Sequence, residues 1–85
     1  ERRGLRSQLT NIALHLLKLE VLSDQLPEAH WRSELAGFRA EVEEMLSESP
    51  SLRHYIASEY QAAWAKARRQ FAPLAAADAM SAPPR

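Results

Sequence analysis

The segment LRSQLTNIALHLLKLEVL, residues 5–22, decides the fold class of this 85-residue chain. Its large apolar residues recur at alternating intervals of four and three, the spacing of a seam along one side of a helix: Leu5, Leu9, Ile12, Leu16 and Leu19. A second apolar stripe lies nearly opposite that seam and consists of Leu14, Leu17 and Val21. Because a helix that is apolar on two opposed sides is buried on both, we expect this helix to be sandwiched between partners.

Two more segments of similar length repeat the helical pattern, and we predict helices over about residues 2–22, 27–48 and 50–71. Pro27 suits the first turn of the second helix, and the Ser49-Pro50 pair predicts the start of the third, with Ser49 as its N-cap. The short link at Ser49-Pro50 predicts that the second and third helices are close antiparallel neighbours. Residues 72–85 are rich in Ala and Pro and are predicted to be a frayed tail, with a weak helical turn over 74–80 as the alternative.

Composition limits the possible folds and functions. Only 5 residues are Val, Ile or Thr, so there is almost nothing from which to build a sheet. The chain has no Cys, a net charge of zero and no apolar run long enough for a membrane span. These features argue against disulfides, thiolate metal sites and generic binding to nucleic acid or anionic membranes. We therefore predict an all-α, antiparallel three-helix bundle, a single domain over residues 1–71, in a cytoplasmic protein.

The charges are distributed unevenly along the chain. The first and third helical segments are net basic, whereas the second is net acidic. Arginines begin the first helix, and four glutamates lie near the end of the second: Glu41, Glu43, Glu44 and Glu48. Since antiparallel packing places these two ends side by side, we expect them to attract each other across the helix interface.

Few side chains could carry chemistry. His15, His30 and His54 are each alone, and although His30 and Glu34 are one turn apart, a metal site needs a third ligand that faces them. Glu59 lies near the inner stripe of the third helix, where it could act as a general base or pair with an arginine. We predict no catalytic residue, no cofactor and no metal, and hence a protein that is not an enzyme.

Several short blocks together resemble one known family. The blocks are Leu14-His15-Leu16-Leu17-Lys18, Trp31-Arg32, Ser49-Pro50-Ser51-Leu52 and Tyr55. In order and spacing they resemble the bacterial family of domains of unknown function number 29, from about residue 1 to residue 71. The resemblance implies an all-helical fold and a further helical stretch before residue 1. It implies no activity, so no residue inherits a catalytic role from it.

The second apolar stripe leads to the functional prediction. We expect a self-associating assembly or protein-interaction module whose interaction face is Leu14, Leu17 and Val21. A second copy of the chain, a preceding N-terminal helix or another protein would cover that face. The alternative is a nucleic-acid-binding module that uses two basic clusters, Arg2-Arg3-Arg6 and Lys66-Arg68-Arg69.

Overall fold

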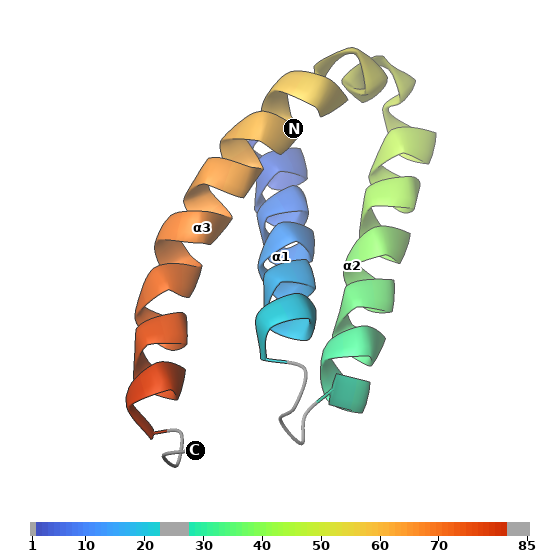
Figure 1. Cartoon of the computed structure of the whole chain (residues 1–85). Coiled ribbons are helices and arrows are strands. Elements are labelled where there is room, and N and C mark those ends of the chain that lie inside the picture. The colour runs from blue at the N-terminus through green and yellow to red at the C-terminus, as the bar shows by residue number, and fades with distance from the viewer. Residues whose placement is uncertain (1, 23–27, 82–85) are drawn as a thin grey trace.

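The computed structural model describes residues 2–22 and 28–81, with side chains as far as residue 77. Three long α-helices make up most of the chain: α1 (Arg2–Val21), α2 (Glu28–Glu48) and α3 (Ile56–Ser81) (Figure 1). A short 3-10 helix, η1 (Pro50–Tyr55), joins α2 to α3. The predicted all-α, three-helix fold is confirmed, and successive helices run in opposite directions.

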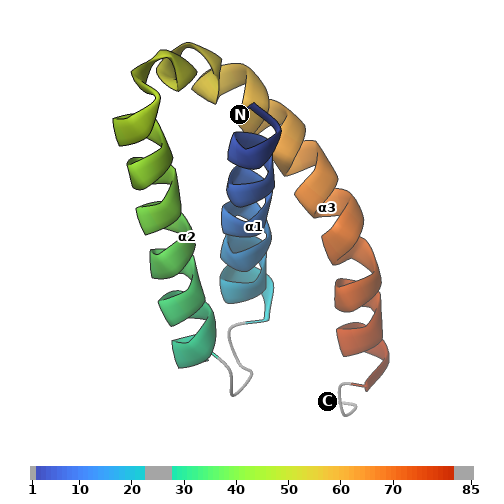
Figure 2. The same ribbon diagram turned by 180° about the vertical axis from the view of Figure 1, so that it is seen from behind.

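The helix α1 lies between the other two, as the views from both sides show (Figures 1 and 2). It packs against α2 on one side and α3 on the other, and so it is sandwiched within the chain itself. Among the described residues no Cα atom of α2 lies within 8 Å of one in α3, and the molecule is a thin layer of 50 × 23 × 14 Å. The prediction that the second and third helices are close neighbours is therefore wrong. The 3-10 helix η1 spans the distance between the end of α2 and the start of α3, so these two helices lie on opposite sides of α1.

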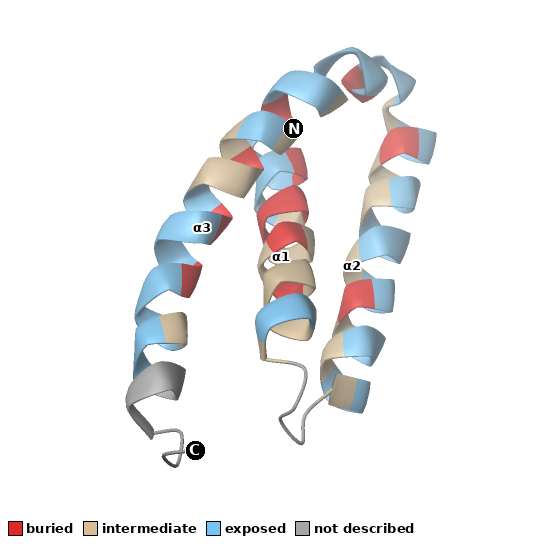
Figure 3. Cartoon of the chain, viewed as in Figure 1, coloured by how far each residue is buried: buried red, intermediate tan, exposed pale blue. Residues whose placement is uncertain are grey.

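The apolar core is concentrated at the end of the molecule that η1 closes. Buried residues from all four elements form it: Leu5, Leu9, Leu46, Leu52 and Ala63. Leu52 of η1 is only 4% exposed and covers the space between the diverging helices, while Ala63 lets α3 approach α1 closely. Figure 3 shows that the buried positions of α3 lie on its side toward α1. The opposite end of the layer has no comparable cover in the described residues.

The start of the third helical segment differs from the prediction. Residues Pro50–Tyr55 form 3-10 turns, and the α-helix begins only at Ile56. Ser49 makes no side-chain capping hydrogen bond; its backbone carbonyl instead accepts from the Leu52 N–H at 2.9 Å. This tighter turn satisfies the free N–H without a side chain. The predicted start of the second helix at Pro27 lies outside the described residues, and α2 begins at Glu28.

The predicted frayed tail is helical as far as Ser81, so the expected end of the helix at Phe71 is wrong. Alanine, the best helix former, occupies most positions from 72 to 79, and its propensity carries the helix past Pro73. The ring of Pro73 removes one backbone donor, but both Pro73 and Arg69, one turn earlier, are exposed. Water can therefore reach the carbonyl that the proline leaves free. Residues 82–85 of the predicted tail lie outside the described residues.

Candidate functional site

Glu59 forms the most buried polar cluster of the described residues. It belongs to the first turn of α3, the residue is only 1% exposed, and two arginines from α1 reach its carboxylate. Arg6 donates from Nε to Oε1 at 2.5 Å, and Arg2 occupies the other oxygen, with Nη2 3.1 Å from Oε2. The guanidinium carbon of Arg2 also lies 4.1 Å from the ring centroid of Tyr55. The beginning of α1 is thus tied to both η1 and α3.

These contacts assign Glu59 a structural position. Hydrogen bonds and charge attraction, chiefly from Arg6, hold the pKa of the Glu59 carboxyl below its ordinary value, although burial acts in the opposite direction. A general base needs a raised pKa, so this environment is the wrong one for that task. Of the two interpretations from sequence, pairing with an arginine is confirmed.

The same pairs correct the expected attraction between the first two helices. Arg2 and Arg6 turn to α3, and none of the four glutamates near the end of α2 forms an ion pair with a described residue. All four are exposed: Glu41, Glu43, Glu44 and Glu48. Because α1 is flanked on both sides, its N-terminal arginines could pair with acids of either α2 or α3. They pair with the buried Glu59 of α3, where a charge-assisted hydrogen bond is stronger than one to an exposed glutamate.

A second polar cluster joins α1 to α2. His15, which is only 6% exposed, has Nδ1 2.9 Å from the Asn11 carbonyl oxygen and Nε2 2.8 Å from Oε1 of Glu34. His30, one turn before Glu34, places its Nε2 3.4 Å from the same oxygen. The edge of the His15 ring also packs on Phe38, with centroids 4.9 Å apart. The hydrogen bond from His15 is the largest cause that lowers the pKa of Glu34, with His30 and Lys18 adding attraction.

Both nitrogens of the His15 ring face acceptors, a carbonyl oxygen and a carboxylate. Through these two contacts the His15 ring is fixed to its own helix at Asn11 and joins α1 to α2 at Glu34. The structure thus brings all three residues, His15, Glu34 and His30, to one place. In the described residues no group of three or more His, Asp or Glu side chains is arranged to hold a metal ion.

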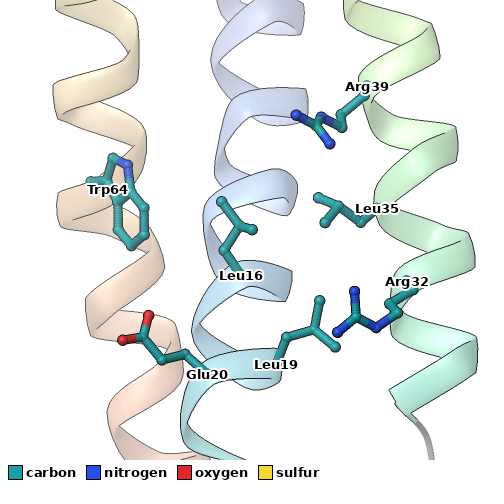
Figure 4. Close-up of a pocket in the computed structure, with 7 residues that line it drawn as sticks. All are labelled: Leu16, Leu19, Glu20, Arg32, Leu35, Arg39 and Trp64. Carbon is teal, nitrogen blue, oxygen red and sulfur yellow. The ribbon is translucent and has the colours of Figure 1, made fainter. Parts of the chain in front are cut away.

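A groove of 530 Å³ opens between α2 and α3, with α1 as its floor (Figure 4). Residues of all three helices line it: Leu16, Leu19, Glu20, Arg32, Leu35, Arg39 and Trp64. Arg32, Leu35 and Arg39 point from α2 toward α1, and Trp64 stands on the α3 wall. A T-shaped contact with Tyr60, centroids 5.9 Å apart, supports the Trp64 ring. The groove exists because the two outer helices pack on opposite sides of α1 and lie apart from each other.

The residues of the predicted interaction face have different environments. Leu14 and Leu17 are half-buried, and Val21, at the end of α1, is 55% exposed. The flanking of α1 by α2 and α3 accounts for part of the two-sided apolar pattern. Of the basic clusters, Arg2 and Arg6 are engaged with Glu59, while Lys66, Arg68 and Arg69 are all exposed on α3.

Sequence reasoning missed the burial of His15 and the existence of the groove. His15 is buried because it follows Ile12 by three positions and precedes Leu19 by four, which places it beside the seam. Trp64 lies beside a helical stripe, yet the structure leaves it half-buried on the groove wall. The groove depends on how far the helices diverge, and periodicity within one helix carries no such information.

Comparison with known proteins gives one finding on relationship. The model of the family described as "Domain of unknown function DUF29" matches residues 1–83. No curated protein and no solved structure matches significantly. As to membranes, none of the helices among the described residues combines the length and the apolar character that crossing a bilayer requires.

Proposed function

Since the chain belongs to the family described as "Domain of unknown function DUF29", a description that names no activity, we propose a function from its surfaces: a protein-interaction module that self-associates and is not itself a catalyst. One observation carries the proposal. Leu16, Leu19 and Trp64 line a groove that no described part of the chain fills. Apolar side chains in a groove of this size favour burial against another protein surface.

The predicted interaction face adds a second apolar area at the same end of α1. Val21 is exposed there, and Leu17 and Leu14 are half-buried one and two turns earlier along the same side. The polar clusters support a role without catalysis, because Glu59 is held by two arginines and Glu34 by two histidines. Both carboxylates are thus occupied by contacts that join helices.

Light scattering on the purified chain tests the proposal. We expect a mass above that of the monomer at high micromolar concentration, with a fraction of associated protein that grows with concentration. A strict monomer throughout that range would contradict self-association. Thermal denaturation, followed by circular dichroism, would show at the same time whether the helices are formed in the sample.

The alternative function, nucleic-acid binding, is supported by the exposed cluster of Lys66, Arg68 and Arg69 on α3. Because the chain has no net charge, such binding would depend on this local cluster alone. A gel shift at low and moderate salt tests it. Absence of a shift at low salt would remove the alternative, whereas a shift that Arg68→Glu abolishes would favour it over the interaction module.

A further inference from the structure

Charged residues of both signs line the groove. Glu20 lies on the α1 floor at one end, and Arg32 and Arg39 lie on the α2 wall. Arg32 has a neighbour in Glu28, with 3.5 Å between Nε and Oε2. Glu20 and Arg39 are exposed, and neither forms an ion pair with another described residue. An apolar strip is thus bordered by one acidic and two basic side chains.

This arrangement is self-complementary. In a two-fold symmetric interface the same patch meets itself, so residue i of one copy contacts residue j of the other, and the reverse contact occurs as well. Two grooves placed face to face would bury Leu16, Leu19 and Trp64 against their counterparts and bring Glu20 of each copy toward Arg39 of the other. The net charge of zero means that no long-range repulsion opposes the approach of two copies.

We propose that the groove is the contact surface of a two-fold symmetric homodimer, with Glu20 of each copy paired to Arg39 of the other. The inference rests on the proposed function and specifies its partner and its surface. The thin, layered shape supports it, because the open face of one layer can lie on that of another without displacing a helix. The apolar strip supplies the attraction, and the two charge pairs fix the relative orientation.

Charge reversal tests this pairing. We expect Glu20→Arg and Arg39→Glu each to raise the dimer dissociation constant by about tenfold or more, because each places like charges together in both symmetric contacts. An equimolar mixture of the two variants should regain the dimer, since both contacts of the mixed pair then join opposite charges. Sedimentation velocity at high micromolar concentration measures the three samples and the unmodified chain.

Matched controls separate pairing from net charge. Glu43→Arg and Arg53→Glu make the same charge changes at exposed positions outside the groove, and we expect neither to change the dissociation constant by as much. Circular dichroism of every variant establishes that the helices are formed. Glu20 and Arg39 are both exposed, so their reversal should leave the fold intact.

The remaining outcomes assign failure to one proposal or the other. If the unmodified chain dimerises and groove reversals match the controls, the groove is overturned and self-association stands. If Val21→Glu then weakens the dimer while the groove variants do not, the contact lies on the predicted face of Leu14, Leu17 and Val21. If the unmodified chain is strictly monomeric, both proposals are contradicted. If each groove variant loses the dimer and the equimolar mixture of Glu20→Arg with Arg39→Glu regains it, the symmetric pairing is supported.

Discussion

Arg6 donates from its guanidinium Nε to Oε1 of Glu59, 53 positions later in the chain, and the contact joins α1 to the first turn of α3. Arg2 takes the other carboxylate oxygen, so each oxygen of Glu59 has its own positive partner. The acid is almost fully buried while both arginines remain half-exposed. Loss of the acid would therefore leave two positive groups facing a site without a counter-charge.

We expect Glu59→Gln to lower the melting temperature by several degrees. The amide keeps the size of the side chain but removes the charge, and its NH₂ group faces a guanidinium that can only donate. Circular dichroism during heating measures the change. Glu48→Gln, at an exposed position near the end of α2, serves as the control and should have a much smaller effect. Equal effects of the two substitutions would contradict the structural role of Glu59.

The two lowered pKa values predict how stability depends on pH. The pKa of Glu59 and that of Glu34 both lie below the ordinary value of 4.5 in the folded chain. Below about pH 4.5 the unfolded chain therefore binds more protons than the folded one, and stability falls as the pH drops toward the lowered values. Above that range the full contribution of both carboxylates is present.

Thermal denaturation across the acidic range checks this dependence. We expect the melting temperature of the unmodified chain to decline from about pH 4.5 downward, and that of Glu59→Gln to decline less steeply because one linked group is missing. Glu34→Gln should flatten the profile as well, since His15, His30 and Lys18 all favour its ionised form. Parallel profiles for the three proteins would show that these carboxylates are not linked to folding.

Gly37 is expected to be a weak point of α2. A Cβ at this position would meet nothing within 4 Å, so no close approach of another helix requires glycine there. Gly37→Ala should raise the free energy of unfolding by about 0.5–1 kcal/mol through helix propensity alone. Urea denaturation measures the gain.

Gly4 provides the matched comparison. A Cβ there would lie 3.2 Å from the Cε of Met45, so that flexible side chain would have to shift. We expect Gly4→Ala to give a smaller gain than Gly37→Ala, although both replace a helical glycine. A larger gain at Gly4 would mean that the packing of Met45 against α1 is looser than the structure indicates.

Pro73 should limit the stability of the last part of α3. Its ring removes one helical hydrogen bond at an exposed position, so Pro73→Ala should strengthen local structure by up to about 3 kcal/mol. Amide hydrogen exchange of residues 74–77 measures local opening. Slower exchange confined to these residues is the expected result, and unchanged exchange would mean that other contacts already control the end of α3.

Much of the fold could be predicted from the sequence because each helix has an inward stripe. The spacing of Leu5, Leu9 and Ile12 identified the core side of α1. The position of Glu59 beside an inner stripe allowed either a general base or an arginine partner, and the structure shows the second. Periodicity tells which side of a helix is buried but not which neighbour buries it. The divergence of α2 from α3 depends on the 3-10 turns of η1, and no side-chain pattern signals those turns.

The candidate site was less predictable for related reasons. The groove is a property of three helices together, and its residues include a leucine that is buried, Leu35, and arginines that are exposed. The contact between His15 and Glu34 joins positions 19 residues apart, so it can be recognised only once the packing of α1 against α2 is known. The continuation of the helix past Phe71 was predicted only as the alternative of a weak turn over 74–80, because proline and alanine, which occur together in this stretch, have opposite helix propensities.

Because α1 lies between the other two helices, the folding of α2 and of α3 depends on it. In the part of the chain that the structure describes, the Cα atoms of α2 and α3 stay more than 8 Å apart and both helices pack on α1, so each is held in the native arrangement chiefly by this one helix. Neither outer helix can order the other directly, and a loss of α1 from its position would release both together. A protein built in this way gains or loses its tertiary structure according to whether its first helix is in place.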